Sequence, residues 1–197
     1  MRNWLKTVPA LVIIGGILFI VLAVGGGLLL WGSNFADNMV HDQLSDQRIR
    51  FPEKGAENFD AKTYPGLQQY AGQAVDSGPK AKAYANEFIA VHLNEIGGGK
   101  TYSELSGQSL ANPKDAELQA TVATMFRGET LRGLLLYAWG WSVVAAIAYW
   151  VGIAALFGAV GVLGALAIGY VVHKRQLKVT EPASAAPVDV RAPVPVH

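Results

Sequence analysis

Two long stretches of the chain carry no charged side chain. They cover residues 7–34 and 133–172, and almost all acidic and basic residues lie between or beyond them. The chain is 51% hydrophobic and only 16% charged, whereas a soluble domain of average composition has about 25% charged residues. An apolar stretch of about 20 residues without charges is typical of a helix that crosses a membrane. The sequence therefore predicts an all-α integral membrane protein with two transmembrane helices.

The first apolar run predicts a transmembrane helix over residues 8–32. Its 24 residues from Val8 to Trp31 span roughly 36 Å at 1.5 Å per residue, enough to cross a hydrocarbon core of about 30 Å. A cleaved signal peptide is the alternative interpretation. The apolar part of a signal peptide has about 7–15 residues and ends at a cleavage site of small residues, whereas this run is longer and ends at a tryptophan. We therefore expect an uncleaved helix.

The second run, residues 133–172, is long enough for one helix or two. A two-helix hairpin needs a turn, and the run contains no proline, asparagine or aspartate to form one. A hairpin would also bring the basic residues after the run to the same side as the central region of the chain. We therefore expect a single transmembrane helix whose outer turns, up to about Trp139, form the end of a stalk. Trp139 and Trp141 would then mark the outer membrane interface.

Basic residues flank both predicted membrane helices. Arg2 and Lys6 lie in residues 1–7, and residues 173–197 begin with a cluster of basic side chains. Because basic residues concentrate on the cytoplasmic side of membrane proteins, we expect both terminal segments in the cytoplasm and residues 33–132 outside it. The last 18 residues contain four prolines, a composition that predicts a disordered tail.

Residues 33–132 predict a small extracytoplasmic helical domain. Residues 35–47 continue the first membrane helix as a stalk. The clearest soluble helix covers residues 79–96, because a proline occupies its first turn and the glycines at 97–99 end it. We expect this central helix to bridge the two stalks.

Two further helix starts precede the second membrane segment. Thr101 and Glu104 have the spacing of a capping box, which predicts a short helix to about Gly107. Asn112 followed by Pro113 combines a capping residue with a first-turn proline. We expect that second helix to run on into the membrane as the other stalk.

Both membrane helices contain small residues at helical intervals. In lipid, close approach of backbones at small residues promotes helix association. We expect these residues to pack the two helices of one chain together, the alternative being that one stripe faces a partner subunit. The predicted helix-packing residues are Gly16, Ala23, Gly27, Ala154, Gly158, Gly161, Ala165 and Gly169.

Two histidines of the central region are the candidates for metal binding. Asp37 precedes His41 by one helical turn, and Glu95 follows His92 by three residues. If the first stalk packs on the central helix, the four side chains could form a two-histidine, two-carboxylate site. The alternative is two histidines with local partners, and no HxxxH, HxH or ExxH spacing supports a metal site. We therefore expect no metal and no cofactor.

Other chemistry lacks a sequence signal. The chain has no cysteine, which excludes disulfides, thiolate metal sites and cysteine nucleophiles. It has no GxSxG motif for serine catalysis and no GxGxxG spacing for phosphate binding. A net charge of +1 without a basic run gives no basis for nucleic-acid binding. We therefore expect a protein that is not an enzyme.

Four segments resemble a family of uncharacterised actinobacterial transmembrane proteins. They are VHDQLSDQRIRFP (40–52), YPGLQQYAGQAVDSG (64–78), AKAYANEFIAVHLNEIGGGKTYSEL (81–105) and MFRGETLRGLLLYAWGW (125–141). The resemblance covers most of residues 1–172 and implies a membrane helix, an outer segment and a second membrane region. Some members carry a ring-opening dioxygenase label. Such an enzyme needs an iron site of two histidines and one carboxylate in a larger fold, so we do not extend that label to this chain.

These observations favour a cell-membrane protein that acts as an accessory or scaffold subunit of a larger membrane complex. Its expected partners are membrane lipids and a protein subunit in the membrane. The alternative is an extracytoplasmic sensor or ligand-binding protein that signals through its stalk helices. That alternative predicts a pocket between the stalks and the central helix, lined by Tyr84, Phe88 and His92.

Overall fold

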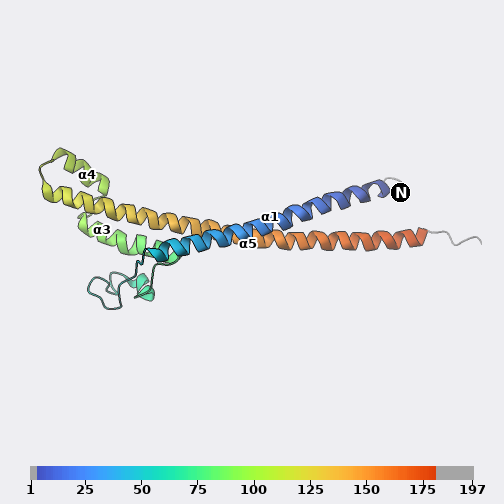
Figure 1. The fold of residues 1–197 in the computed structure, drawn as a ribbon, viewed down its shortest axis with the longest axis horizontal. Coiled ribbons are helices and arrows are strands. Elements are labelled where there is room, and N and C mark those ends of the chain that lie inside the picture. Colours follow the sequence, from blue (N-terminus) through green and yellow to red (C-terminus); the bar gives the residue numbers. More distant parts are fainter. Residues whose placement is uncertain (1–3, 181–197) are drawn as a thin grey trace, which may run out of the picture. The chain divides into compact units, whose positions relative to one another are not determined.

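The structure, a computed structural model, describes residues 4–180. The regular elements of these residues are helices, and no β-strand occurs among them (Figure 1). The expected all-α class is confirmed. The chain divides into two compact units, unit 1 (Met1–Gly25 and Ala154–His197) and unit 2 (Gly26–Ile153). The elements are α1 (Trp4–Asp46), the 3₁₀ helix η1 (Pro65–Tyr70), α2 (Gly78–Ala83), the π-helical segment η2 (Tyr84–Ile89), α3 (Ala90–Ile96), α4 (Tyr102–Ala111) and α5 (Ala116–Thr180).

Two of these helices, α1 and α5, are long and apolar enough to cross a membrane. α1 contains the first apolar run and the predicted stalk as one helix of 43 residues, and it ends at Asp46 just before Arg48, whose φ of 55° is incompatible with a continuing helix. α5 is a single helix of 65 residues without a turn. It begins at Ala116 rather than at Pro113, because the Asp115 carboxylate accepts a hydrogen bond from the Leu118 N–H at 2.9 Å and caps the helix there.

In unit 1, the first part of α1 packs against the last part of α5. A Cβ atom added to Gly15 would lie 2.8 Å from Leu166 Cδ2, and one added to Gly158 would lie 3.4 Å from Leu22 Cδ1. The glycines therefore admit leucine side chains of the opposite helix. This is the packing of small against large residues that brings membrane helices together.

Unit 2 contains a buried hydrophobic core between the rest of α1, the start of α5 and the segments that connect them. The chain after α1 forms a loop whose two ends pair through the Phe51 N–H and the Gln73 carbonyl and through the Val75 N–H and the Ile49 carbonyl, each at 2.9 Å. The core residues are Val40, Leu44, Phe51, Phe59, Tyr64, Leu67, Val75, Ala81, Ala83, Ala85, Ile89, Leu93, Leu105, Met125 and Leu135.

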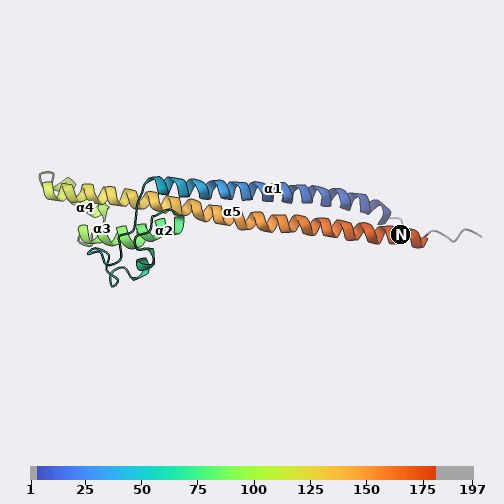
Figure 2. The same ribbon diagram turned by 60° about the horizontal axis from the view of Figure 1, so that its bottom comes forward.

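The predicted central helix is continuous but contains a π-helical segment. α2, η2 and α3 follow one another without a break from Gly78 to Ile96 (Figure 2). The helix ends at Ile96 with Gly97 as its C-cap, and Gly98 and Gly99 have φ values of 59° and 80°, which glycine adopts without strain. Gly78 touches α5 directly, since a Cβ atom at this position would overlap the Ser142 side chain.

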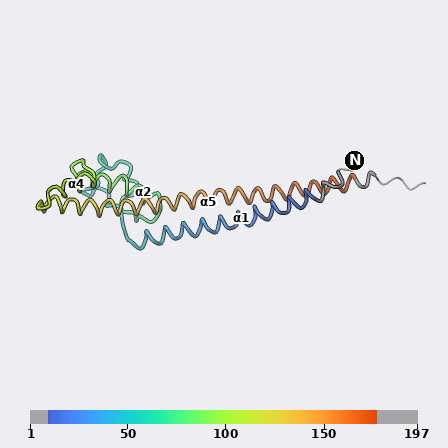
Figure 3. The backbone as a smooth tube through the Cα atoms, turned by 90° about the horizontal axis from the view of Figure 1, so that it is seen from above, coloured from blue at the N-terminus to red at the C-terminus, as the bar shows by residue number. Residues whose placement is uncertain are grey.

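The capping box of Thr101 and Glu104 starts α4 as predicted, with both reciprocal hydrogen bonds present. α4 continues to Ala111, four residues beyond the expected end. It lies beside the first turns of α5 (Figure 3), where the Tyr102 and Phe126 rings are 5.7 Å apart. α4 thereby covers the part of the core near Met125.

We predict that Gly78→Ala destabilises the protein by about 1–3 kcal/mol, because the added methyl group overlaps Ser142 and forces α2 away from α5. The free energy of unfolding in detergent measures the effect. Gly107→Ala is the matched control. A Cβ atom there meets nothing within 4 Å, so this variant should be neutral or gain up to about 1 kcal/mol. Equal stability of the two variants would contradict the packing described.

Candidate functional site

The structure gives His41 a local partner. Its Nδ1 donates a hydrogen bond to the Asp76 carbonyl oxygen at 2.9 Å, while Lys80 Nζ lies 3.0 Å from the Asp76 carboxylate. This hydrogen bond from Lys80 holds the pKa of the Asp76 carboxyl below its usual value, and nearby His41 adds to the effect. His41 thus ties the end of the loop to α1.

His92 belongs to a cluster of aromatic rings. Its ring centroid lies 4.4 Å from that of Phe88 and 5.9 Å from that of Tyr64. His92 Nδ1 donates to the Phe88 carbonyl oxygen at 2.9 Å, and Tyr64 Oη lies 3.2 Å from the same nitrogen. Burial raises the pKa of the Tyr64 hydroxyl, with a further contribution from the negative charge of Glu95. These contacts hold the ring within the core.

The four candidate metal ligands are therefore not brought together. His41 is held at Asp76, His92 at Tyr64, and Glu95 is exposed on α3. Among residues 4–180, no three histidine, aspartate or glutamate side chains form a group that could hold a metal ion. The spacing of each pair along its own helix does not specify how the two helices face one another, which is why the sequence left this possibility open.

The rings expected to line a sensor pocket pack against one another. Phe88 contacts Tyr84 at 4.9 Å, Tyr64 at 5.5 Å and Phe59 at 6.0 Å between ring centroids. Burial raises the pKa of the Tyr84 hydroxyl. The π-helical segment begins at Tyr84, so it helps to direct these rings into the core of unit 2.

We predict that Phe88→Ala lowers the free energy of unfolding by about 2–3 kcal/mol, somewhat less than the roughly 3–5 kcal/mol typical of a fully buried phenylalanine. Phe126→Ala is the control, since its ring is exposed and contacts only Tyr102 among the ring pairs of the described residues. The control should cost less than about 1 kcal/mol. Chemical unfolding followed by circular dichroism measures both, and an unchanged stability of Phe88→Ala would show that the ring is not part of the core.

Most of the predicted helix-packing residues of α5 lie outside its contact with α1, Gly158 being the exception. Ala154, Gly158, Gly161, Ala165 and Gly169 are all exposed. On α1, Gly16 and Ala23 are half-buried and Gly27 is exposed. The predicted set contains five glycines. Only at Gly158 would an added Cβ atom lie within 4 Å of another residue.

The helix contact uses a different set of small residues. Gly26, Ser33 and Val40 of α1 are buried and recur every seventh residue, as do Ala145, Gly152 and Ala159 of α5. This spacing is the heptad repeat of supercoiled helices. A search for the seven-residue repeat, rather than for small residues alone, could have identified this face in the sequence.

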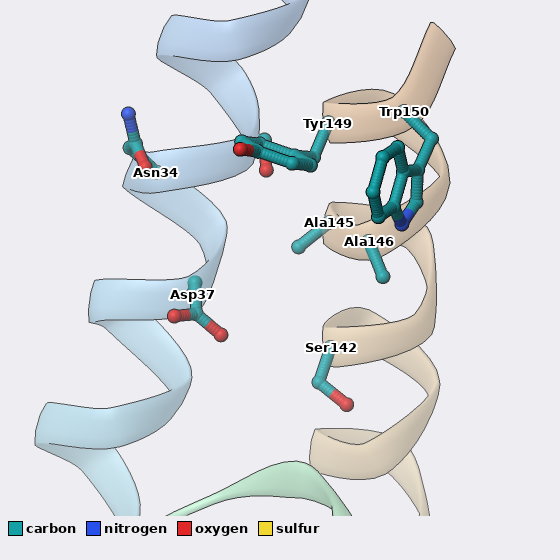
Figure 4. Close-up of a pocket in the computed structure, with 8 residues that line it drawn as sticks. Asn34, Asp37, Ser142, Ala145, Ala146, Tyr149 and Trp150 are labelled. Atoms are coloured by element: carbon teal, nitrogen blue, oxygen red, sulfur yellow. The ribbon is translucent and has the colours of Figure 1, made fainter. Parts of the chain in front are cut away.

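A recess that includes several polar groups, here called the polar recess, opens between α1 and α5 within unit 2 (Figure 4). Its volume of about 330 Å³ is at the lower end of the range of small-molecule pockets. The recess exists because several facing side chains are small. It is lined by Ser33, Asn34 and Asp37 of α1 and by Ser142, Ala145, Ala146, Tyr149 and Trp150 of α5.

The polar groups of the recess come from both helices. Asp37 extends from α1 toward α5, and Tyr149 extends from α5 toward α1 (Figure 4). Ser33 is 5% exposed, and Ser142 donates its hydroxyl hydrogen to the Trp139 carbonyl oxygen at 2.7 Å. A carboxylate, hydroxyl groups and aromatic faces can bind a cation. None of the described groups in the recess forms a nucleophile and base pair.

Most of this recess has no signal in the sequence. Asp37 was singled out, but only as a partner of His41. Tyr149 and Trp150 lie more than a hundred residues from Ser33 along the chain, so their proximity depends on how α1 and α5 pair. The one local indication of a polar site is the pair Ser33 and Asn34 near the end of an uncharged run.

A second, apolar groove of about 490 Å³ lies between the same two helices in unit 2. Its walls carry no charged side chain. The groove is lined by Met39, Val40, Gln43, Leu44, Gln47, Leu134, Leu135, Tyr137, Ala138 and Trp141.

No family model, no curated protein and no solved structure matches the sequence. The resemblance to actinobacterial transmembrane proteins therefore remains an expectation from sequence motifs. A proposal for the function therefore rests on the geometry of the chain itself.

Proposed function

We propose that the protein is a non-enzymatic cell-membrane protein that serves as an accessory or scaffold subunit of a larger membrane complex. α1 and α5 both cross the membrane, the two termini are cytoplasmic and the chain between the membrane segments is extracytoplasmic. The basic residues that flank both apolar runs support this orientation.

The exposure of the apolar helices supports their contact with lipid. Only 6% of the most apolar window of α1 and 11% of that of α5 is buried. The core helix of a soluble protein is instead mostly buried, because exposed apolar surface is unfavourable in water. Lipid or other membrane helices therefore cover these faces.

The pairing of the helices supports an outer membrane boundary near Trp31 on α1 and Tyr149 on α5. A Cβ atom at Gly152 would lie 3.0 Å from the Gly26 carbonyl oxygen and 3.1 Å from the Leu30 side chain. Residues 149–172 then form the second span, and their 24 residues equal the length of the first apolar run. The outer aromatic belt consists of Trp31, Tyr149 and Trp150, rather than of the tryptophans at 139 and 141.

The observation that carries the proposal is the apolar surface of α5 above this boundary. Residues 133–148 lie beside the charged part of α1 but carry no charge themselves. Leu134, Tyr137 and Val144 are 59%, 66% and 53% exposed, and the apolar groove adjoins them. Apolar surface outside the bilayer is typical of a protein interface. Its continuity with the membrane span indicates a partner whose own membrane helix extends outward alongside α5.

We predict that Leu134→Lys removes a stoichiometric partner subunit that copurifies with the wild-type protein under mild detergent extraction, since a buried lysine in the interface costs several kcal/mol. Leu110→Lys on α4 is the matched control, because Leu110 is 82% exposed and lies outside the groove. This control should retain the partner. A wild-type protein that is extracted as a lone monomer would argue against the proposal.

The orientation has its own test, which uses the lack of native cysteine. A membrane-impermeant maleimide applied to intact cells should label Ser106→Cys in α4 at once. It should label Lys174→Cys only after the cells are permeabilised. Labelling of Lys174→Cys in intact cells would overturn the topology.

The second candidate function is an extracytoplasmic sensor or ligand-binding protein. The polar recess is the observation that favours it, because a bound ligand there contacts both stalk helices at once. Ligand binding could then alter the way α1 and α5 pair, provided that the ligand binds two arrangements of the helices with different affinity.

A further inference from the structure

We propose that the polar recess between α1 and α5 binds a phosphoethanolamine group, with the ammonium held by Asp37 and the aromatic faces of Tyr149 and Trp150. The ligand class is a primary ammonium beside a phosphate, as in the headgroup of an ethanolamine phospholipid. The lipid source rests on the membrane placement proposed above. The chemistry of the recess does not depend on the partner subunit.

Two aromatic rings form adjacent walls of the recess. The ring centroids of Tyr149 and Trp150 are 5.4 Å apart and the ring planes meet at 81°. In this edge-to-face pair the edge of one ring meets the face of the other, and the π-faces that remain open can attract an ammonium group. Trp150 is 68% exposed, so one wall is open to an incoming ligand.

Asp37 supplies the negative charge. It has no salt bridge and no side-chain hydrogen bond within the described part of the chain. Lys80 is paired with Asp76, and the His41 ring is bonded to the Asp76 carbonyl. The Asp37 carboxylate is thus free to accept hydrogen bonds from an ammonium group, which a quaternary choline group cannot donate.

The other polar groups suit the phosphate and the remaining ammonium hydrogen. Ser33 is almost fully buried, lines the recess and makes no side-chain hydrogen bond among residues 4–180. Its hydroxyl can accept from the ammonium, while the Tyr149 hydroxyl and the Trp150 indole N–H can donate to phosphate oxygens. No basic side chain lines the recess, so a purely anionic headgroup is not favoured.

The position of the recess agrees with this ligand. Ser33 and Asn34 lie near the end of the uncharged run of α1, and Tyr149 begins the second span in the pairing described above. Tyrosine and tryptophan are enriched at the headgroup level of a bilayer. A headgroup can therefore enter the recess from the side while its acyl chains remain in the membrane.

Native mass spectrometry of the full chain released from micelles with equal amounts of ethanolamine, choline and glycerol phospholipids tests the proposal. The wild-type protein should retain one ethanolamine lipid at least tenfold over the other two classes. Asp37→Asn and Trp150→Leu should each reduce that retention at least tenfold. Asp42→Asn and Trp141→Leu, which change the same residue types outside the recess, should not. Unchanged thermal unfolding of Asp37→Asn shows that the variant is folded.

Equal retention by the wild type and Asp37→Asn, or no preference for the ethanolamine lipid, overturns the proposal. A second experiment distinguishes a lipid headgroup from a free phosphoethanolamine group as the ligand. Soluble phosphoethanolamine is added to the protein that carries its bound ethanolamine lipid in nanodiscs of glycerol phospholipid. Displacement of the bound lipid by millimolar phosphoethanolamine identifies the free group as sufficient, whereas retention of the lipid shows that the acyl chains are required. Asp37→Asn should still copurify with the partner subunit, and Leu134→Lys should still retain the lipid. The two proposals can thus fail separately.

Discussion

The close contact between α1 and α5 is the constraint on which the rest of the structure depends. In unit 2 the Gly26 backbone reaches Gly152, and in unit 1 Gly15 admits the Leu166 side chain. Such contacts are possible only where the facing residue is small. They fix which residue of one helix lies opposite which residue of the other, and a shift by one helical turn would replace a glycine with a larger side chain in the contact.

Both hollows of unit 2 follow from this pairing. Beside the close contact that includes Ser33 and Ala145, the neighbouring side chains of Ser142 and Ala146 are small, and the polar recess results. Further along the pair, the loop and the central helix pack onto one side of the two helices, as the overlap between Gly78 and Ser142 indicates. The apolar groove lies between the same helices, where Leu44 and Leu135 form its floor.

The sequence predicted the elements of this fold better than their contacts. The uncharged runs, the capping box at Thr101 and the glycines after Ile96 each act through neighbouring residues, so their effect can be read locally. Which face of α5 meets α1 depends instead on the fit of two helices. Gly161 and Gly169 satisfied the small-residue pattern yet remain exposed, because Ala159 and Gly152 fit the opposing helix in their place.

The unequal lengths of the two uncharged runs explain why part of the apolar surface of α5 lies beside charged residues of α1. The second run has 40 residues, whereas the first has 28, so part of α5 must lie beside charged residues of the other segment. Only the helix contacts decide at which end this excess occurs. Because Gly152 lies opposite Gly26, the excess falls next to Asp37 and His41 rather than at the basic end. In the proposed membrane placement this part of α5 lies outside lipid, so another apolar surface must cover it, and this need is the physical reason to propose a protein partner.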